Sequence, residues 1–77
     1  MDYEHAVPLT ALTEGIDVLV DTVCGHAAHR LRDVGLREGA QVAIVRNTGN
    51  VIVRVEGCRI GLRHEIARQI LGIPIGG

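Results

Sequence analysis

Aromatic side chains are almost absent from this chain of 77 residues, which has one Tyr and neither Trp nor Phe. The single aromatic, Tyr3, stands near one end of the sequence, where chains commonly fray. One ring cannot form the stacking platform on which many proteins bind single-stranded nucleic acid. The same shortage excludes the aromatic-lined groove that small barrels use for proline-rich peptides.

Lysine and serine are also missing, and eight arginines with nine acidic residues give a net charge of −1. Because no basic excess is present to attract a phosphate backbone, we expect no nucleic-acid partner. The lack of Ser and Lys removes two common nucleophiles, and no glycine-rich phosphate loop ending in Lys occurs. We therefore expect a protein that is not an enzyme.

Targeting features are lacking as well. The start, MDYEHAVPLT, has neither the basic nor the apolar region of a signal peptide. No apolar run approaches the roughly 20 residues of a membrane span. Cys24 and Cys58 can form at most one disulfide, and in a reducing compartment they are expected as free, partly buried thiols. We expect a cytoplasmic protein without membrane insertion.

Branched aliphatic residues dominate what is present. Ten Val and eight Ile favour strands, because these side chains suit a pleated surface. Ile16, Val18 and Val20 alternate with polar residues, which predicts a half-buried strand. Turn residues at 47–50 and at Glu56-Gly57 predict hairpins. The further strands expected from these patterns cover residues 40–46, 51–56, 58–62 and 73–75.

The apolar period changes to a helical one near 26–34. Ala27, Leu31 and Val34 fall on one face of a short amphipathic helix. Gly35 is expected to end it in a left-handed conformation, with Leu36 as the apolar partner of that stop. A second helix is predicted near 64–71, ended by Gly72.

These elements predict a fold class that is mainly β with short helices. Strands of four to eight residues joined by short turns favour a small barrel of about five strands, since closure removes exposed sheet edges. A chain of this length has room for one core, so residues 1–77 are expected to form a single domain.

Two leucine-glycine patterns follow one another along the chain. Residues 31–39 read L-x-x-V-G-L-x-x-G, and residues 57–67 read G-x-x-I-x-L-R-x-x-x-A. Together with the opening LTALTEGIDVLVDTV, they resemble the FeoA family over about residues 7–75. That family comprises small cytosolic SH3-like barrels that assist bacterial ferrous iron uptake. The framework positions that we expect to be structural are Leu31, Gly35, Gly39 and Gly57.

The resemblance implies a helper of FeoB, the membrane protein with a GTP-binding domain that moves Fe(II) inward. It implies a binding or regulatory role without catalysis and without a required cofactor. Two features differ from the family pattern. The hairpin at 47–50 is short, and Ile52 stands where a polar residue is usual. Because a partner would bury exposed apolar surface, Ile52 and the neighbourhood of Leu36 are the candidate partner-binding residues.

The segment CGHAAH supports a different hypothesis. Cys24, His26 and His29 supply a thiolate and two imidazoles within six residues. Asp33 is a candidate fourth ligand, or would orient the ring of His29. Zn(II) and Fe(II) are the candidate metals, and such nitrogen and sulfur ligands suit Zn(II) better. The simpler interpretation is an exposed polar stripe in which His29 and Asp33 pair.

Three functions from different classes therefore follow from the sequence. The first is an adaptor for a FeoB-like transporter, which the family resemblance favours. The second is a small zinc-binding or metal-sensing SH3-like domain. The third is a nucleic-acid-binding small barrel.

Overall fold

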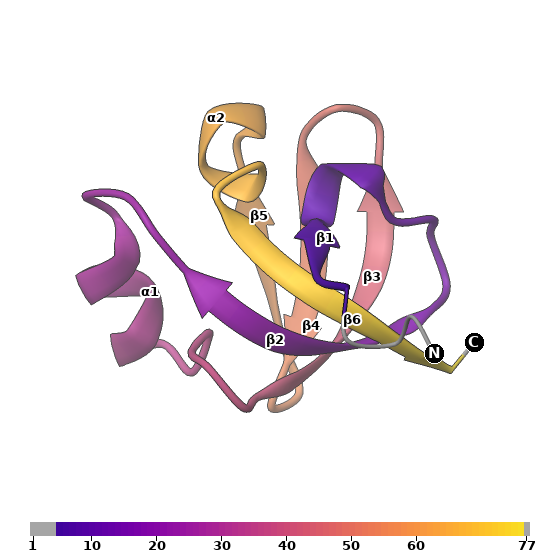
Figure 1. The fold of residues 1–77 in the computed structure, drawn as a ribbon, viewed down its shortest axis with the longest axis horizontal. Helices are drawn as coiled ribbons and strands as arrows, with labels where there is room; N and C mark the ends of the chain where they lie inside the picture. Colours follow the sequence, from indigo (N-terminus) through magenta and orange to yellow (C-terminus); the bar gives the residue numbers. More distant parts are fainter. Residues whose placement is uncertain (1–4, 77) are drawn as a thin grey trace.

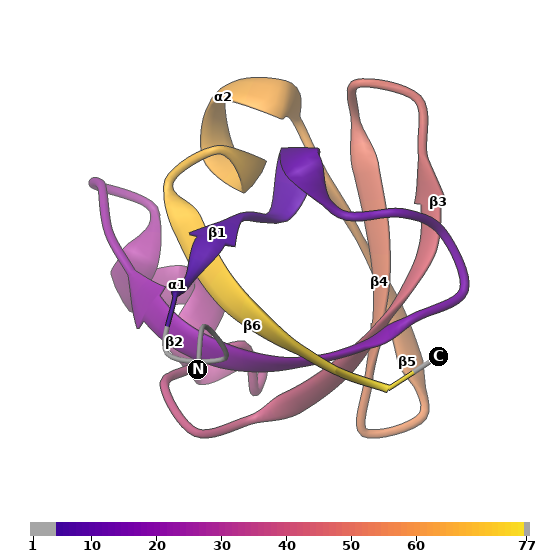
Figure 2. The same cartoon turned by 45° about the vertical axis from the view of Figure 1, so that its right-hand side comes forward.

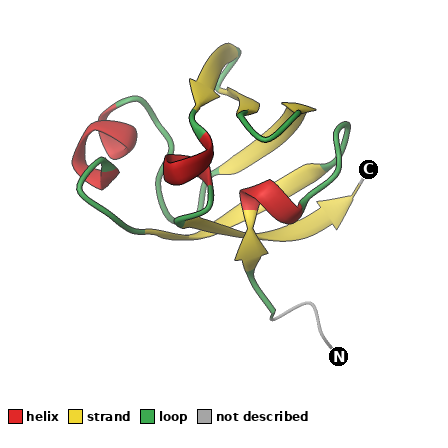
Figure 3. Cartoon of the chain, turned by 90° about the horizontal axis from the view of Figure 1, so that it is seen from above, coloured by secondary structure: helices red, strands yellow, loops and turns green. Residues whose placement is uncertain are grey.

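A computed structural model describes residues 5–76, and Tyr3 lies outside that range. Six strands and three short helices follow one another along the chain (Figure 1). They are β1 (Val7–Pro8), η1 (Leu9–Ala11), β2 (Asp17–Val23), α1 (Ala28–Asp33), β3 (Gln41–Asn47), β4 (Val51–Val55), β5 (Cys58–Leu62), α2 (His64–Ala67) and β6 (Ile70–Gly76). Figure 3 shows that the helices are short turns set in the connections between strands.

The strands form one antiparallel sheet in the order β1-β6-β2-β3-β4-β5. The sheet curls around a common interior, as Figure 2 shows, so the predicted mainly β class and small barrel are confirmed. The interior is filled by aliphatic side chains, and the largest completely buried ones are Leu9, Leu36, Ile44, Ile70, Val18, Val20, Val42, Val51, Val53 and Val55. Among the described residues, no polar or charged residue is buried.

Strand β2 changes its inward face partway along. Val18 and Val20 are buried, as the alternation predicts, but the pairing with β6 shifts register between Val20 and Thr22. This irregularity turns Val23 into the core, where only 4% of it is exposed. The bulge thus lets even-numbered residues before it and an odd-numbered residue after it face the core.

Helix α1 ends as expected but begins later, and only part of its predicted buried face is buried. The amide of Leu36 donates to the carbonyl of Leu31, and the amide of Gly35 donates to that of Arg32. With Gly35 at φ 97°, these two bonds form the Schellman motif that the sequence predicts. The assignment of Val34 to the buried face is wrong, because it is 54% exposed. The inward positions are Ala28 and Leu31.

The predicted helix at 64–71 is too long by one turn. Helix α2 ends at Ala67, and Ile70 already pairs with Val23 of β2. Three β-branched isoleucines in residues 70–76, together with pairing to β2, favour the strand over the helix. Gly72 is therefore not a helix cap. A Cβ at that position would collide with Val18 Cγ1, so Gly72 permits close packing of β6 on β2.

Gly35→Val is expected to destabilise the fold by about 1–2 kcal/mol, because valine is strained at positive φ. A Cβ at residue 35 would also lie 3.2 Å from Val55 Cγ1 and 3.3 Å from Glu56 Cδ. Chemical denaturation measures the change in free energy of unfolding. Gly61→Val is the matched control, since no heavy atom lies within 4 Å of a Cβ there. Equal stability of the two variants would contradict the capping role.

Candidate functional site

A shallow groove of about 190 Å³ opens on the sheet where β4 and β5 run side by side. Its lining residues are Asn50, Val51, Ile52, Gly61, Leu62 and Arg63. Ile52 is half-buried here, so a partner could cover more of it. The groove is the candidate functional site because it combines uncovered apolar surface with a neighbouring cation.

The alternation of β4 and one glycine create this groove. Val51 and Val53 point into the core, which leaves Ile52 between them on the outer face. Directly opposite Ile52 on β5 stands Gly61. Because Gly61 has no side chain to cover its cross-strand neighbour, one flank of Ile52 stays open.

Hydrogen bonds hold the end of the groove in place. The Oδ1 atom of Asn50 accepts a bond of 3.1 Å from the amide of His64, and His64 Nδ1 lies 3.1 Å from the carbonyl oxygen of Gly49. On the other side of the hairpin, Asn47 Nδ2 donates to the carbonyls of Thr10 and Leu12, at 3.0 and 2.8 Å. The β3–β4 hairpin is thus tied to α2 and to both η1 and the residue that follows it.

Leu36 cannot serve as the second partner-binding residue. Its exposed fraction is 0%, and it belongs to the hydrophobic core beside Leu31. The apolar contact that completes the Schellman motif draws it inward. The prediction for Leu36 is therefore wrong, whereas Ile52 does line an open groove.

The four predicted metal ligands are not brought together. Helix α1 begins at Ala28, so His26 precedes it and the two histidines do not share a helical face. His29 Nε2 and Asp33 Oδ2 lie 3.8 Å apart on the exposed side of α1. In residues 5–76, no three His, Cys, Asp or Glu side chains cluster closely enough to hold a metal ion. Binding of Zn(II) or Fe(II) stays a prediction.

Both cysteines are free, as expected, but their predicted partial burial is wrong. Cys24 lies in the exposed turn before α1, and Cys58 begins β5 at an exposed position. Cys58 stands opposite Val55, and cross-strand partners share a face of the sheet. Val55 is nevertheless buried whereas Cys58 is exposed, because Cys58 begins the strand at the margin of the core.

An ion pair that sequence reasoning missed fastens α1 to the barrel. Arg32 Nη2 and Nε donate to the two carboxylate oxygens of Glu38, at 2.9 and 3.2 Å. Both side chains also bond Val23: Arg32 Nη2 donates to its carbonyl and Glu38 Oε2 accepts from its amide. The bonds from Arg32 and from the amides of Glu38 and Val23 lower the pKa of Glu38 to about 2.

Of the lining residues, sequence reasoning singled out Ile52 alone as a partner-binding residue, and the exposed ones that it missed are Asn50, Gly61 and Arg63. For Gly61 and Arg63, the alternation of the strand could have predicted their outward positions, because they lie two residues apart on and just after β5. Asn50 has no comparable signal, because its side chain acts through the amide of His64, far along the chain.

This curled antiparallel sheet, with a short helix leading into its last strand, defines the class of small SH3-like domains. The FeoA domain family matches residues 7–74, and the chain belongs to that family. The family is associated with ferrous iron transport.

Three solved FeoA structures are similar to this chain. The crystal structure of an iron uptake regulatory protein (FeoA) has 25% identity and a TM-score of 0.81, over 92% of this chain and 99% of that one. FeoA from Chlorobium tepidum has 27% identity and a TM-score of 0.80, over 91% and 71%. The zinc complex of Stenotrophomonas maltophilia FeoA, described as a prokaryotic SH3 domain protein, has 25% identity and a TM-score of 0.76, over 87% and 89%.

Comparison with curated protein sequences gave no match. No helix in the described part of the chain is long and apolar enough to cross a membrane.

The ion pair of Glu38 predicts a specific acid sensitivity. Because the pKa of Glu38 falls from 4.5 to about 2 in the folded protein, its contribution to stability is full above pH 4.5 and is lost as pH falls towards 2. The difference in Tm between the wild type and Glu38→Gln should therefore shrink across that window. Asp33→Asn is the control, because its 3.8 Å pair with His29 is mostly exposed. A difference for Glu38→Gln that does not vary with pH would contradict this role.

Proposed function

We propose that this protein is a non-catalytic accessory protein of ferrous iron uptake that docks on the cytosolic part of a FeoB-type GTPase-transporter. Membership of the FeoA family supports the link to ferrous iron transport. A related protein, FeoA of Stenotrophomonas maltophilia, is described as a candidate activating factor of bacterial ferrous iron transport. The protein would act in the cytoplasm, where the transporter exposes its GTP-binding domain.

The observation that carries the docking proposal is the open flank of Ile52. Its side chain lies on the outer face of β4, in a groove whose floor at Gly61 carries no side chain. An apolar side chain of the partner would fit over Gly61 and remove both surfaces from water, which favours association. The groove is fixed by the bonds of Asn50 and His64, so little ordering is needed on binding.

Ile52→Glu is expected to abolish co-purification with the transporter's cytosolic domain and to reduce ferrous iron uptake in cells. A carboxylate in place of the Ile52 side chain would have to be desolvated on docking, which opposes association where the apolar side chain favours it. A pull-down and an uptake assay measure the two effects, and the Tm of the variant shows that it folds.

Val34→Glu is the matched control, because Val34 is exposed at the end of α1 and does not line the groove. It should bind and support uptake as the wild type does. Normal uptake with a folded Ile52→Glu protein would show that this surface is the wrong one. Normal uptake without the protein would contradict the transport role itself.

The proposed role needs no nucleotide chemistry in this chain. We expect no saturable binding of GTP or ATP, since the sequence has no phosphate loop and neither Ser nor Lys. Isothermal calorimetry with the protein alone tests this. Binding with micromolar affinity would overturn the non-catalytic assignment.

A further inference from the structure

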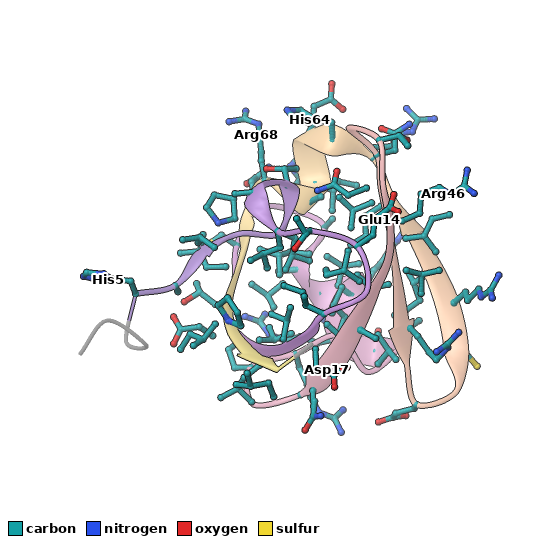
Figure 4. The ribbon with its side chains drawn as sticks, turned by 90° about the vertical axis from the view of Figure 1, so that its right-hand side faces the viewer. His5, Glu14, Asp17, Arg46, His64 and Arg68 are labelled. Atoms are coloured by element: carbon teal, nitrogen blue, oxygen red, sulfur yellow. The ribbon has the colours of Figure 1, made fainter. Side chains whose placement is uncertain are left out.

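Four of the eight arginines surround the groove on the outer face of β3, β4 and β5. Arg54 stands directly opposite Arg59, and Arg46 stands opposite Ile52. Cross-strand partners share a face of the sheet, and Ile52 faces outward, so these side chains point away from the core. Figure 4 shows Arg46 extending from the barrel. Arg63 lines the groove itself.

None of the four arginines on this arginine face forms an ion pair within residues 5–76, although Glu14, whose carboxylate accepts from the amide of Asn47, lies near Arg46. The two ion pairs found in that range, Arg32 with Glu38 and His29 with Asp33, involve other residues. Like charges directly opposite one another in a sheet are destabilising. The pair of Arg54 and Arg59 therefore weakens the isolated protein.

Protection of a sheet edge explains only part of this pattern. A charged side chain on an edge strand discourages unwanted strand pairing, and Arg59 on β5 meets that need. Arg54 lies on β4, between two other strands, where no edge has to be protected. A partner with negative charge accounts for both residues.

The geometry of β5 indicates the shape of that partner. β5 is the last strand of the sheet and pairs only with β4, so its other edge lacks a strand. Arg59 and Gly61 occupy alternate positions on β5, and Arg63 continues the alternation in the extended residue just after the strand. An extended segment laid beside β5 would meet a cation, an open space and a second cation in turn.

We infer that the arginine face and the free edge of β5 bind an extended acidic segment of the transporter's cytosolic part. The segment pairs as an added strand and carries an acidic residue, an apolar residue and an acidic residue at positions i, i+2 and i+4. The apolar side chain enters the groove over Gly61 and contacts Ile52, while the carboxylates meet Arg59 and Arg63. This inference rests on the proposed function and specifies the chemistry of its partner.

Charge on this face also raises the question of a nucleic acid. The whole chain carries a net charge of −1 and has one aromatic residue, so it lacks both the long-range attraction and the stacking surface for such a ligand. An apolar groove at the centre of the four arginines instead suits a peptide side chain.

The test measures the Kd of the transporter's purified cytosolic domain for the full-length protein and for Arg54→Glu/Arg59→Glu. The double variant should bind at least about tenfold more weakly, because it presents carboxylates to an acidic segment. Wild-type binding should weaken as the salt concentration rises from about 0.05 M to about 0.5 M. Hydrogen exchange should slow at β5 amides in the complex.

The matched control is Arg37→Glu/Arg68→Glu, which changes the net charge equally at exposed positions outside the groove. Figure 4 shows Arg68 on a different side of the barrel from Arg46. The control should bind within about twofold of the wild type. Equal losses in both double variants would indicate general charge attraction and overturn the inference.

The remaining outcomes separate the two proposals. Failure of the wild type to bind would overturn the proposed function and this inference together. Unchanged binding by a folded Arg54→Glu/Arg59→Glu protein would overturn only the inference. Salt-dependent binding of a single-stranded oligonucleotide that is lost in that variant would assign the face to nucleic acid instead.

A stability measurement distinguishes a binding role from a structural one. Arg54→Glu alone places opposite charges across the strands, so its Tm should rise by about 2–5 °C while its affinity for the transporter domain falls. A lower Tm together with weaker binding would mean that Arg54 supports the fold, which would contradict the inference.

Discussion

The fold depends on Gly72 of β6, which pairs with β2 and has no side chain where Val18 and Leu9 pack. A Cβ on Gly72 would collide with Val18 Cγ1 and lie 3.3 Å from Leu9 Cδ2. With hydrogen there, Leu9, Val18 and Ile70 all become fully buried, and the two distant parts of the chain close the interior. The same pairing fixes where the chain enters β6, and thereby places α2 and His64 on the β3–β4 hairpin.

Inward and outward positions of the strands have separate roles. Valine side chains on β4 fill the interior, and the alternate positions carry Ile52 and Arg54. Because the core is complete without the outward residues, that face can hold an unfavourable pair of cations and still fold. A face that weakens the free protein gives a physical reason to look for a partner there, which membership of a family alone does not supply.

Patterns local in sequence were predicted well from the chain itself. Period-two alternation located β2 to β5, and Gly35 with Leu36 identified the end of α1, because neighbouring residues determine both. Contacts between distant residues were not predictable. Ile70 is in a strand because it pairs with Val23 of β2, which is distant in the sequence. Leu36 is buried because it packs in a core built from several distant strands. The groove likewise required the register that sets Gly61 against Ile52.

The chain leaves the sheet near Val20 and returns to it at Gly39 and Ala40, which are hydrogen-bonded to Val20. The amide of Val20 donates to the carbonyl of Ala40, and the amide of Gly39 donates to the carbonyl of Val20. A short hairpin could therefore join the two strands in the same register. Such a shortened chain would lose the end of β2 that pairs with β6, and would lack Val23, Ala28, Leu31 and Leu36 of the hydrophobic core. The segment between Val20 and Gly39 therefore adds core side chains that the two strands, joined directly, would not supply.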